Sequence, residues 1–306
     1  MPACSSLSPR RVARTGPGLF VVAGLLWGTG GLAGSFLASR TGLPPASVAA
    51  YRLLVGGALI TSFTRHPAAL GSALRAPGAP ARLASTGVLM AVYQTAYFAA
   101  VQATSVSMAT LTTMVAIPVL VTVGSTVLDR RRPTFRSVGS VVTAVCGLVL
   151  LLDSPVGADT RRAEGAGLAL LAALGFSVLT LQRRTAPPGP ERDPTIGLGF
   201  LAGGVLLLPA GLASGMQLPL RADAFGAVLF LGLVPTALAY SSYFAGLHRA
   251  GAGAGVVAVL LEPLTATLLA VLLGRDRLNG VQILGAALTL FSIGIQQART
   301  RDTCDL

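Results

Sequence analysis

Two residues that carry a charge in water lie deep inside long apolar stretches of this sequence. Glu262 stands about ten residues from either end of its stretch, or about 15 Å deep in a helix that rises 1.5 Å per residue. A carboxylate at that depth is costly unless it faces a cavity or a partner. Because an apolar environment favours the neutral acid, Glu262 is a candidate for proton coupling or cation binding. The alternative is a hydrogen-bonded structural acid beside Pro263, where carbonyl groups lose their donors.

Arg52 lies about a third of the way into another apolar stretch. Its guanidinium group suits an anionic substrate group, and it can also pair with Glu262 in one conformation of the protein. Two other interpretations stay open. The side chain extends its charged end to the nearer membrane interface, or it only stabilises packing.

Six further aromatic or polar residues occupy positions that bring them together on helix faces. Tyr93 and Tyr97 are four residues apart, and Tyr240 and Tyr243 are three apart, so each pair shares one face of a helix. We expect a hydrogen-bonding cavity wall, with helix packing or an interfacial aromatic belt as the alternative. The six residues are Trp27, Tyr93, Gln94, Tyr97, Tyr240 and Tyr243.

Pro118 and Pro263 stand near the middle of two apolar stretches. A proline inside a helix removes one backbone hydrogen bond and bends the helix. The two residues are therefore candidate hinges, with static kinks as the alternative.

The composition indicates the surroundings of these residues. Of the 306 residues, 53% are hydrophobic and 11% are charged, and the mean hydropathy is +0.72. The apolar residues form blocks of about 20, which as helices cross a hydrocarbon core of about 30 Å and satisfy their own backbone hydrogen bonds. The sequence thus predicts an all-α polytopic integral membrane protein with ten transmembrane helices. The predicted spans are 18–38, 46–64, 83–102, 106–128, 134–152, 165–182, 195–214, 224–247, 252–273 and 280–297.

The arginines indicate how the helices are oriented. All 23 basic residues are arginine; with the N-terminus inside, 16 fall in inner segments, 6 in outer segments, and Arg52 within a span. Because positively charged loops stay in the cytoplasm, we expect both termini to be cytoplasmic in a plasma or inner membrane. The predicted outer arginines are Arg40, Arg161, Arg162, Arg221, Arg275 and Arg277.

The two halves of the chain resemble each other. Tyr97-Phe98-Ala99-Ala100 in the third predicted span matches Tyr243-Phe244-Ala245-Gly246 in the eighth, and a central proline follows each tyrosine after 21 and 20 residues. A five-helix repeat is odd-numbered, so its second copy inserts inverted; such repeats place a binding site near the midplane and permit alternating access. The predicted parts are a cytoplasmic tail at 1–17, five-helix repeats at 18–152 and 165–297, and a cytoplasmic tail at 298–306.

With these features the sequence resembles the EamA family of the drug/metabolite transporter superfamily over nearly its whole length. The likeness rests on Leu26-Trp27-Gly28, Ala50-Tyr51-Arg52, the Pro118 helix, Leu260-Leu261-Glu262-Pro263 and the Gly-Ala-Ala-Leu run from Gly285. The family typically has a glutamate after each proline helix, where this chain has Asp129 and Asp276. The resemblance implies ten helices around a central cavity and the transport, often export, of metabolites, amino acids or drugs.

We therefore expect a secondary transporter, an exporter of a small metabolite, amino acid or drug-like compound, that works by alternating access through a central midplane cavity. An importer or uniporter is the first alternative, and a membrane enzyme or scaffold subunit is the second. The expected partners are a small-molecule substrate and the lipid bilayer, with proton coupling and a homodimer as further hypotheses.

Other classes of function lack a signal in the sequence. It contains no P-loop, serine nucleophile elbow or HExxH motif, so we expect no ATP-driven transport by this chain alone, no enzyme activity and no cofactor. Cys4, Cys146, Cys304 and the two histidines have no metal-ligand spacing. The net charge of +12 comes mostly from arginines between the apolar blocks, so we expect no nucleic-acid partner.

Overall fold

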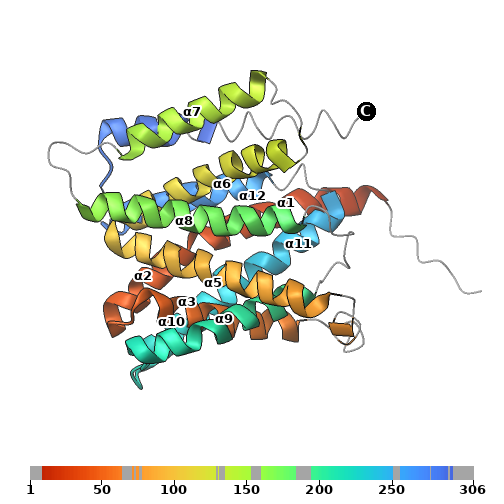
Figure 1. Cartoon of the computed structure of the whole chain (residues 1–306), viewed down its shortest axis with the longest axis vertical. Helices are drawn as coiled ribbons and strands as arrows, with labels where there is room; N and C mark the ends of the chain where they lie inside the picture. Colours follow the sequence, from red (N-terminus) through yellow and green to blue (C-terminus); the bar gives the residue numbers. More distant parts are fainter. Residues whose placement is uncertain are drawn as a thin grey trace, which may run out of the picture.

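The apolar stretches of the sequence fold into helices that pack side by side (Figure 1). The computed structural model of the chain describes residues 9–63, 71, 74–75, 78–128, 130, 135–152, 160–183, 194–250, 256–275, 277–288 and 290–291. Within these residues every regular element is a helix, which confirms the all-α prediction. The labelled elements are α1 (Pro9–Gly28), α2 (Gly30–Thr41), α3 (Pro45–Ser62), α5 (Ala79–Ala103), α6 (Val106–Leu128), α7 (Phe135–Leu152), α8 (Thr160–Arg183), α9 (Pro194–Ser214), α10 (Ala222–Gly232), η1 (Leu233–Leu238), α11 (Ala239–Ala250) and α12 (Val256–Leu272). Residues 280–288 are also helical.

The first predicted span is broken near its middle. α1 ends at Gly28 and α2 begins at Gly30, with Thr29 between them. The backbone N–H and the hydroxyl group of Thr29 both donate to the Leu26 carbonyl oxygen, at 3.2 and 2.7 Å, which makes a turn at this point. Glycine on either side weakens the helix further. α1 also begins at Pro9, so part of the predicted N-terminal tail is helical.

The eighth predicted span also departs from a continuous α-helix. α10 passes into η1, a π-helical turn at Leu233–Leu238, before α11 begins. Pro235 lies in this turn and has no N–H to donate to the Leu231 carbonyl one turn earlier. The Thr236 hydroxyl group donates to that carbonyl instead, at 2.8 Å. Pro235 thus lies where the helix widens into a π-helical turn, and the Thr236 side chain supplies the hydrogen bond that the proline cannot donate.

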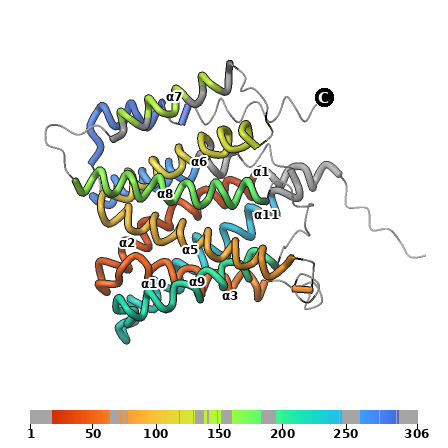
Figure 2. Tube along the Cα trace, in the orientation of Figure 1, coloured from red at the N-terminus to blue at the C-terminus, as the bar shows by residue number. Residues whose placement is uncertain are grey.

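Successive helices run from one end of the bundle to the other, as Figure 2 traces. The turns at 42–44, 104–105, 215–221, 273–275 and 277–279, all predicted to lie outside, meet at the left-hand end in Figure 1. Among the described residues, five helical stretches are long and apolar enough to cross a membrane: Gly18–Thr41, Val106–Leu128, Thr160–Gln182, Thr195–Ser214 and Ala222–Tyr243. Large apolar side chains such as Leu174, Val205 and Phe225 are exposed around them, as expected for a surface that faces lipid.

The helices of the two halves pack in the same way, with the roles of the halves exchanged. α1 of the first half packs against α11 and α12 of the second, just as α8 of the second half packs against α5 and α6 of the first. α3 packs against α9, and α6 against α12, so equivalent helices also meet each other. This packing is that of two repeats related by a two-fold axis. Because each repeat has five spans, the second is inverted relative to the first.

Glycines allow α3 and α9 to approach until their backbones touch. A Cβ atom on Gly57 of α3 would lie 2.7 Å from the Leu201 nitrogen and 2.8 Å from the Gly197 carbonyl oxygen in α9. Small residues of this kind permit close helix packing where lipid gives no hydrophobic driving force between helices. The contact fixes α3, and with it Arg52, against the second repeat.

We expect Gly57→Ala to lower the thermal stability of the protein and Gly226→Ala to preserve or raise it. Both glycines lie in helices, where alanine is favoured over glycine by about 1 kcal/mol. The methyl group on residue 57 meets backbone atoms, whereas nothing lies within 4 Å of a Cβ on Gly226. Thermal unfolding of both variants in one detergent measures the difference. Equal stability of the two variants would contradict the backbone contact.

Candidate functional site

Arg52 of α3 reaches the centre of the bundle, where neutral acceptors hold it. It is only 6% exposed. Its Nε donates to the Thr236 hydroxyl at 3.1 Å, one terminal nitrogen donates to Gln94 Oε1 at 3.1 Å, and the other donates to the Pro235 carbonyl at 3.4 Å. The guanidinium carbon also lies 5.8 Å from the centre of the Phe98 ring, within range of a cation–π contact.

The charge of Arg52 has no direct counter-ion among the described side chains. None of their carboxylates forms a salt bridge with it. A buried cation is costly without a partner, and three hydrogen bonds to neutral groups offset only part of that cost. The three bonds use three of the five N–H donors of the guanidinium group, so two donors remain for another acceptor.

The π-helical turn explains how the second repeat presents an acceptor to Arg52. The Thr236 hydroxyl group uses its proton for the Leu231 carbonyl that Pro235 leaves without a donor. Its lone pairs therefore face the Arg52 Nε–H. The proline, the threonine and the arginine form one connected unit across the two repeats.

Thr236→Val should destabilise the protein by about 1–3 kcal/mol, the cost of buried groups left without hydrogen bonds. Valine keeps the shape of threonine but neither donates to the Leu231 carbonyl nor accepts from Arg52. Thr236→Ser keeps the hydroxyl group and should retain most of the stability. Thermal unfolding of the two variants measures the difference. The role of the hydroxyl group is refuted if the Thr236→Val protein is as stable as the Thr236→Ser protein.

Trp27 of α1 and two tyrosines of α11 form an aromatic group beside this unit. The Trp27 ring centroid lies 5.1 Å from that of Tyr240 and 5.1 Å from that of Tyr243. Tyr240 also meets Phe200 of α9 edge-on at 5.0 Å. The indole N–H of Trp27 is buried and has no acceptor among the described residues. The aromatic group therefore presents ring surfaces and one hydrogen-bond donor, the Trp27 N–H, that has no acceptor among the described residues.

α5 supplies a second wall, made of tyrosines and an amide. The rings of Tyr93 and Tyr97 lie 6.3 Å apart, and the Tyr97 hydroxyl group is 2.7 Å from the Thr110 hydroxyl group of α6. Gln94 is fully buried; it accepts from Arg52, but its amide nitrogen has no partner within the described part of the chain. This wall, too, has an unused buried donor.

Glu262 of α12 completes the group from the second repeat. Its side chain is half-buried, and its carboxyl group lies within electrostatic range of Arg52, Tyr93, Tyr97 and Tyr240. It is thus close to the arginine without forming a salt bridge with it. An acid and a base of opposite charge, each from a different repeat, therefore lie within electrostatic range of each other inside the bundle.

Comparison with known proteins shows which protein family has this architecture. The model of the EamA-like transporter family matches the chain twice, over residues 14–153 and 163–295. The chain belongs to the EamA-like transporter family. The resemblance expected from the sequence is confirmed, and the two matches coincide with the two halves seen in the packing. The protein is a multi-pass membrane transporter.

Relatives of the transporter match it along nearly their whole length. It is 29% identical over 295 residues to "Uncharacterized transporter YwfM" of Bacillus subtilis (strain 168), covering 92% of this chain and 94% of that protein. It is 23% identical over 278 residues to "Uncharacterized inner membrane transporter YicL" of Salmonella typhimurium, covering 89% and 92%. A solved crystal structure, 24% identical, superposes with a TM-score of 0.65 over 95% of this chain and 99% of that one. That superposition supports the fold.

The repeats of the transporter carry different chemistry at equivalent positions. Where α1 meets α12, a Cβ on Gly28 would lie 2.9 Å from the carbonyl oxygen of Glu262, the residue before the helix proline. Where α8 meets α6, the Ser177 hydroxyl group donates to the carbonyl of Ile117, again the residue before the helix proline, at 3.3 Å. Equivalent helix pairs make both contacts, so Glu262 corresponds to Ile117.

The surroundings of Arg52 also differ between the repeats. Arg52 contacts Gln94 between the second and third spans, whereas the apolar Phe200 contacts Tyr240 between the seventh and eighth. Each repeat of the transporter thus supplies one charged residue to the central group: Arg52 from the first and Glu262 from the second.

The structure brings the eight predicted site residues to one region. Hydrogen bonds, ring contacts or electrostatic interactions connect Arg52, Gln94, Trp27, Tyr93, Tyr97, Tyr240, Tyr243 and Glu262. Their roles in binding stay predictions. The sequence analysis missed Pro235, Thr236, Phe98 and Thr110; a proline followed by threonine inside the eighth predicted span was the available signal for the first two.

The two candidate hinges lie inside helices. Pro263 is buried within α12, which runs continuously through it. The backbone of α6 is helical through Pro118, whose side chain falls outside the described residues, as do Asp129 and Asp276. In the described part of the transporter, no group of three His, Cys, Asp or Glu side chains is placed to hold a metal ion.

Proposed function

We propose that this chain is a secondary transporter that exports a small metabolite, amino acid or drug-like compound by alternating access. The observation that supports this most directly is the proximity of Arg52 and Glu262, near an aromatic wall inside the bundle. A scaffold has no need of two costly charges at this depth. A plasma or inner membrane location agrees with the printed name of the Salmonella relative.

The unused donors indicate what kind of substrate fits. Buried donors in proteins nearly always have an acceptor, yet Trp27 Nε1 and Gln94 Nε2 have none among the described residues. Two N–H groups of Arg52 are also available. A ligand with a carboxylate or another strong acceptor would satisfy these donors, and the rings of Tyr240 and Tyr243 would cover its apolar or cationic part. An amino acid or a similar zwitterion has both features.

The inverted repeats supply a route for movement. Rocking of one repeat against the other exposes the shared space first to one side and then to the other. Pro118 and Pro263 would give α6 and α12 the flexibility for this change. Glu262, which has no salt-bridge partner among the described residues, would release its proton when water reaches the space and regain it when the space closes. This exchange would couple export to proton entry.

Transport into reconstituted vesicles tests the proposal. Purified protein in vesicles is screened with labelled amino acids, carboxylic acids and amphiphilic drugs, with and without an imposed pH gradient. We expect saturable movement of at least one class, faster with the gradient, and recovery of the compound unchanged. An importer would accumulate substrate only in the opposite orientation, and an enzyme would return an altered product. Absence of movement for every class, in either orientation, would refute the proposal.

Topology gives an independent prediction. A reporter enzyme that is active only outside the cytoplasm should be active when fused after residue 157 and silent when fused after residue 133. The arginine count requires this result, because it places the loop between the fifth and sixth spans outside. The opposite pattern of activity would reverse the orientation of every helix.

A further inference from the structure

A cavity lies at the predicted outer end of the bundle, apart from the central group. Its volume is about 660 Å³. The end of α5, the starts of α6 and α8, and the segment that follows α12 enclose it, so both repeats contribute. Nothing in the central mechanism requires this space.

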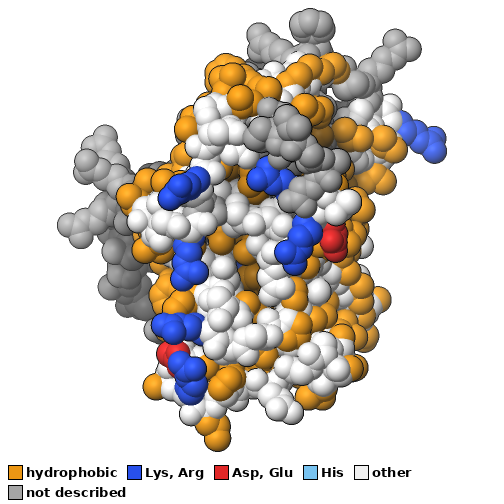
Figure 3. All heavy atoms as spheres, turned by 90° about the vertical axis from the view of Figure 1, so that its left-hand side faces the viewer, with side chains coloured by type: hydrophobic (Ala, Val, Ile, Leu, Met, Phe, Trp, Pro, Cys, Tyr) orange, Lys and Arg blue, Asp and Glu red, His pale blue; other side chains and the backbone are white. Residues whose placement is uncertain are grey.

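Four of the six predicted outer arginines line this cavity. They are Arg161 and Arg162 at the start of α8 and Arg275 and Arg277 after α12, and the described lining contains no acidic residue. Figure 3 shows basic side chains set around the middle of this face, with few acidic ones beside them. Because arginine is disfavoured in outer segments, four of them around one cavity call for an explanation other than topology.

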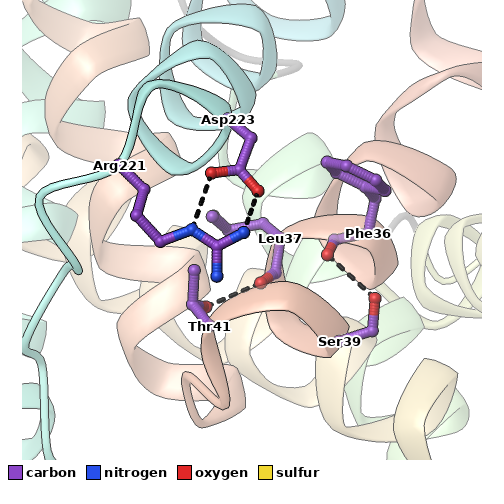
Figure 4. Close-up of polar contacts among 6 residues, drawn as sticks. All are labelled: Phe36, Leu37, Ser39, Thr41, Arg221 and Asp223. Atoms are coloured by element: carbon purple, nitrogen blue, oxygen red, sulfur yellow. Dashed lines mark hydrogen bonds and ion pairs between the residues drawn. The ribbon is translucent and has the colours of Figure 1, made fainter.

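The other two outer arginines have ordinary surface roles. Arg221 forms a bidentate pair with Asp223, at 3.1 and 2.8 Å (Figure 4). Arg40 lies over the Phe36 ring, 5.4 Å from its centre. Neither residue lines the cavity, so these two arginines provide a matched control for the other four.

Helix ends add to the positive potential of the cavity. α6 begins at Val106, α8 begins at Thr160, and another helix begins at residue 280, so three helix N-termini surround it. Each N-terminus carries a partial positive charge. Asn279 and Gln282 cap the last of these helices reciprocally, at 2.8 and 3.0 Å, which fixes this wall of the cavity.

We infer that the cavity binds a phosphate group, from either a soluble phosphorylated compound or an anionic phospholipid headgroup. Guanidinium groups bind phosphate oxygens in a bidentate manner, and several of them together suit a divalent oxyanion better than a monovalent one. Arg161 and Arg162 have other interactions as well, so Arg275 and Arg277 are the residues to vary. The inference concerns binding and does not depend on transport through the central space.

Calorimetry with inorganic phosphate tests the inference. The full-length protein is placed in nanodiscs of zwitterionic lipid at constant ionic strength and a slightly alkaline pH, where phosphate is mainly divalent. We expect binding by the wild type and by the control Arg40→Gln/Arg221→Gln. Arg275→Gln/Arg277→Gln should bind at least about tenfold more weakly, since it removes two charged hydrogen-bond donors. Removal of outer arginines makes the inner segments still richer in positive charge than the outer ones, so both double variants should keep the orientation of the wild type in the membrane.

A second variant and a second lipid sharpen the result. Arg275→Lys/Arg277→Lys keeps the charge without the planar fork, so it should bind with intermediate affinity and guards against a folding defect in the glutamine variant. If anionic phospholipid in the nanodisc competes with phosphate in the wild type only, the headgroup is the natural ligand; if it does not compete, the ligand is soluble. The inference is overturned if the wild type gives no more heat with phosphate than with sodium chloride. It is equally overturned if the control loses as much affinity as the cavity variant.

Discussion

Transport should fall by about two to three orders of magnitude when Arg52 is replaced by methionine, because loss of a buried charged partner costs about 3–5 kcal/mol. The proposed substrate supplies the acceptor that Arg52 lacks in the structure. Three hydrogen bonds to Thr236, Gln94 and Pro235 orient the guanidinium group and leave two donors available. Methionine has a similar length but offers neither charge nor donors. Initial rates in reconstituted vesicles, normalised to folded protein, measure the loss.

The folded protein should survive the Arg52→Met change. An apolar residue removes the cost of burying a charge, which offsets the loss of three hydrogen bonds to neutral acceptors. Arg52→Lys keeps the charge but not the fork, so its rate should lie between the two. Arg40→Met is the matched control, because Arg40 is an exposed arginine at the outer end of α2. Wild-type transport by Arg52→Met would show that Arg52 only stabilises packing.

Much of the architecture could be predicted from the sequence because lipid imposes simple rules. Apolar length, the uneven distribution of arginine and the repeated tyrosine–proline spacing each depend on local sequence alone. The cost of burying charge likewise pointed to Arg52 and Glu262 before any contact was known. Family matches to the two halves and the exchanged packing of those halves then confirmed the repeats.

The contacts between repeats were beyond the reach of the same reasoning. Arg52 and Thr236 are 184 residues apart, and helical periodicity shows which face a residue occupies but not which helix it meets. The break at Thr29 and the π-helical turn at Pro235 depend on which local donors replace a missing backbone bond. Three interpretations of Arg52 were open for this reason. Tertiary packing buries its guanidinium group inside the bundle, which argues against extension to the membrane interface; whether Arg52 binds substrate or only stabilises packing stays a prediction.

The outer arginines illustrate the same limit. In the sequence they are exceptions to a topology rule, and each could be read only as a loop residue. Arg161 and Arg275 are far apart in the chain, and they line one cavity only because α8 and the segment after α12 come together at this end of the bundle. A count of charges cannot detect such a grouping, whereas the packed helices show it directly.

Glu262→Gln should abolish the acceleration of transport by a pH gradient while leaving insertion and substrate binding intact. Glutamine keeps the size of the protonated acid and much of its hydrogen-bonding capacity, but it cannot ionise. Glu262 is half-buried and lies within electrostatic range of Tyr93, Tyr97 and Tyr240, and it is near Arg52 without forming a salt bridge. A carboxyl group in such a space binds a proton more readily when the space is closed to water than when it is open.

The two-fold relation between the repeats explains why this one residue matters. The position equivalent to Glu262 in the first repeat is Ile117, so that repeat has no acid at this position to take over the exchange of protons. Glu164→Gln is the matched control, since it makes the same chemical change at an exposed acid near the start of α8. The control should respond to the gradient as the wild type does.

Uptake into vesicles with and without a pH gradient separates coupling from movement. The wild type should transport faster with the gradient, whereas Glu262→Gln should show one rate in both conditions and still exchange substrate across vesicles loaded on both sides. Preserved exchange would show that the cavity still opens to each side, so the defect lies in the proton step alone. A wild type that ignores the gradient, or a glutamine variant that responds to it as strongly, would leave Glu262 with a structural role. In that case its proximity to Arg52 would serve only to offset the buried positive charge.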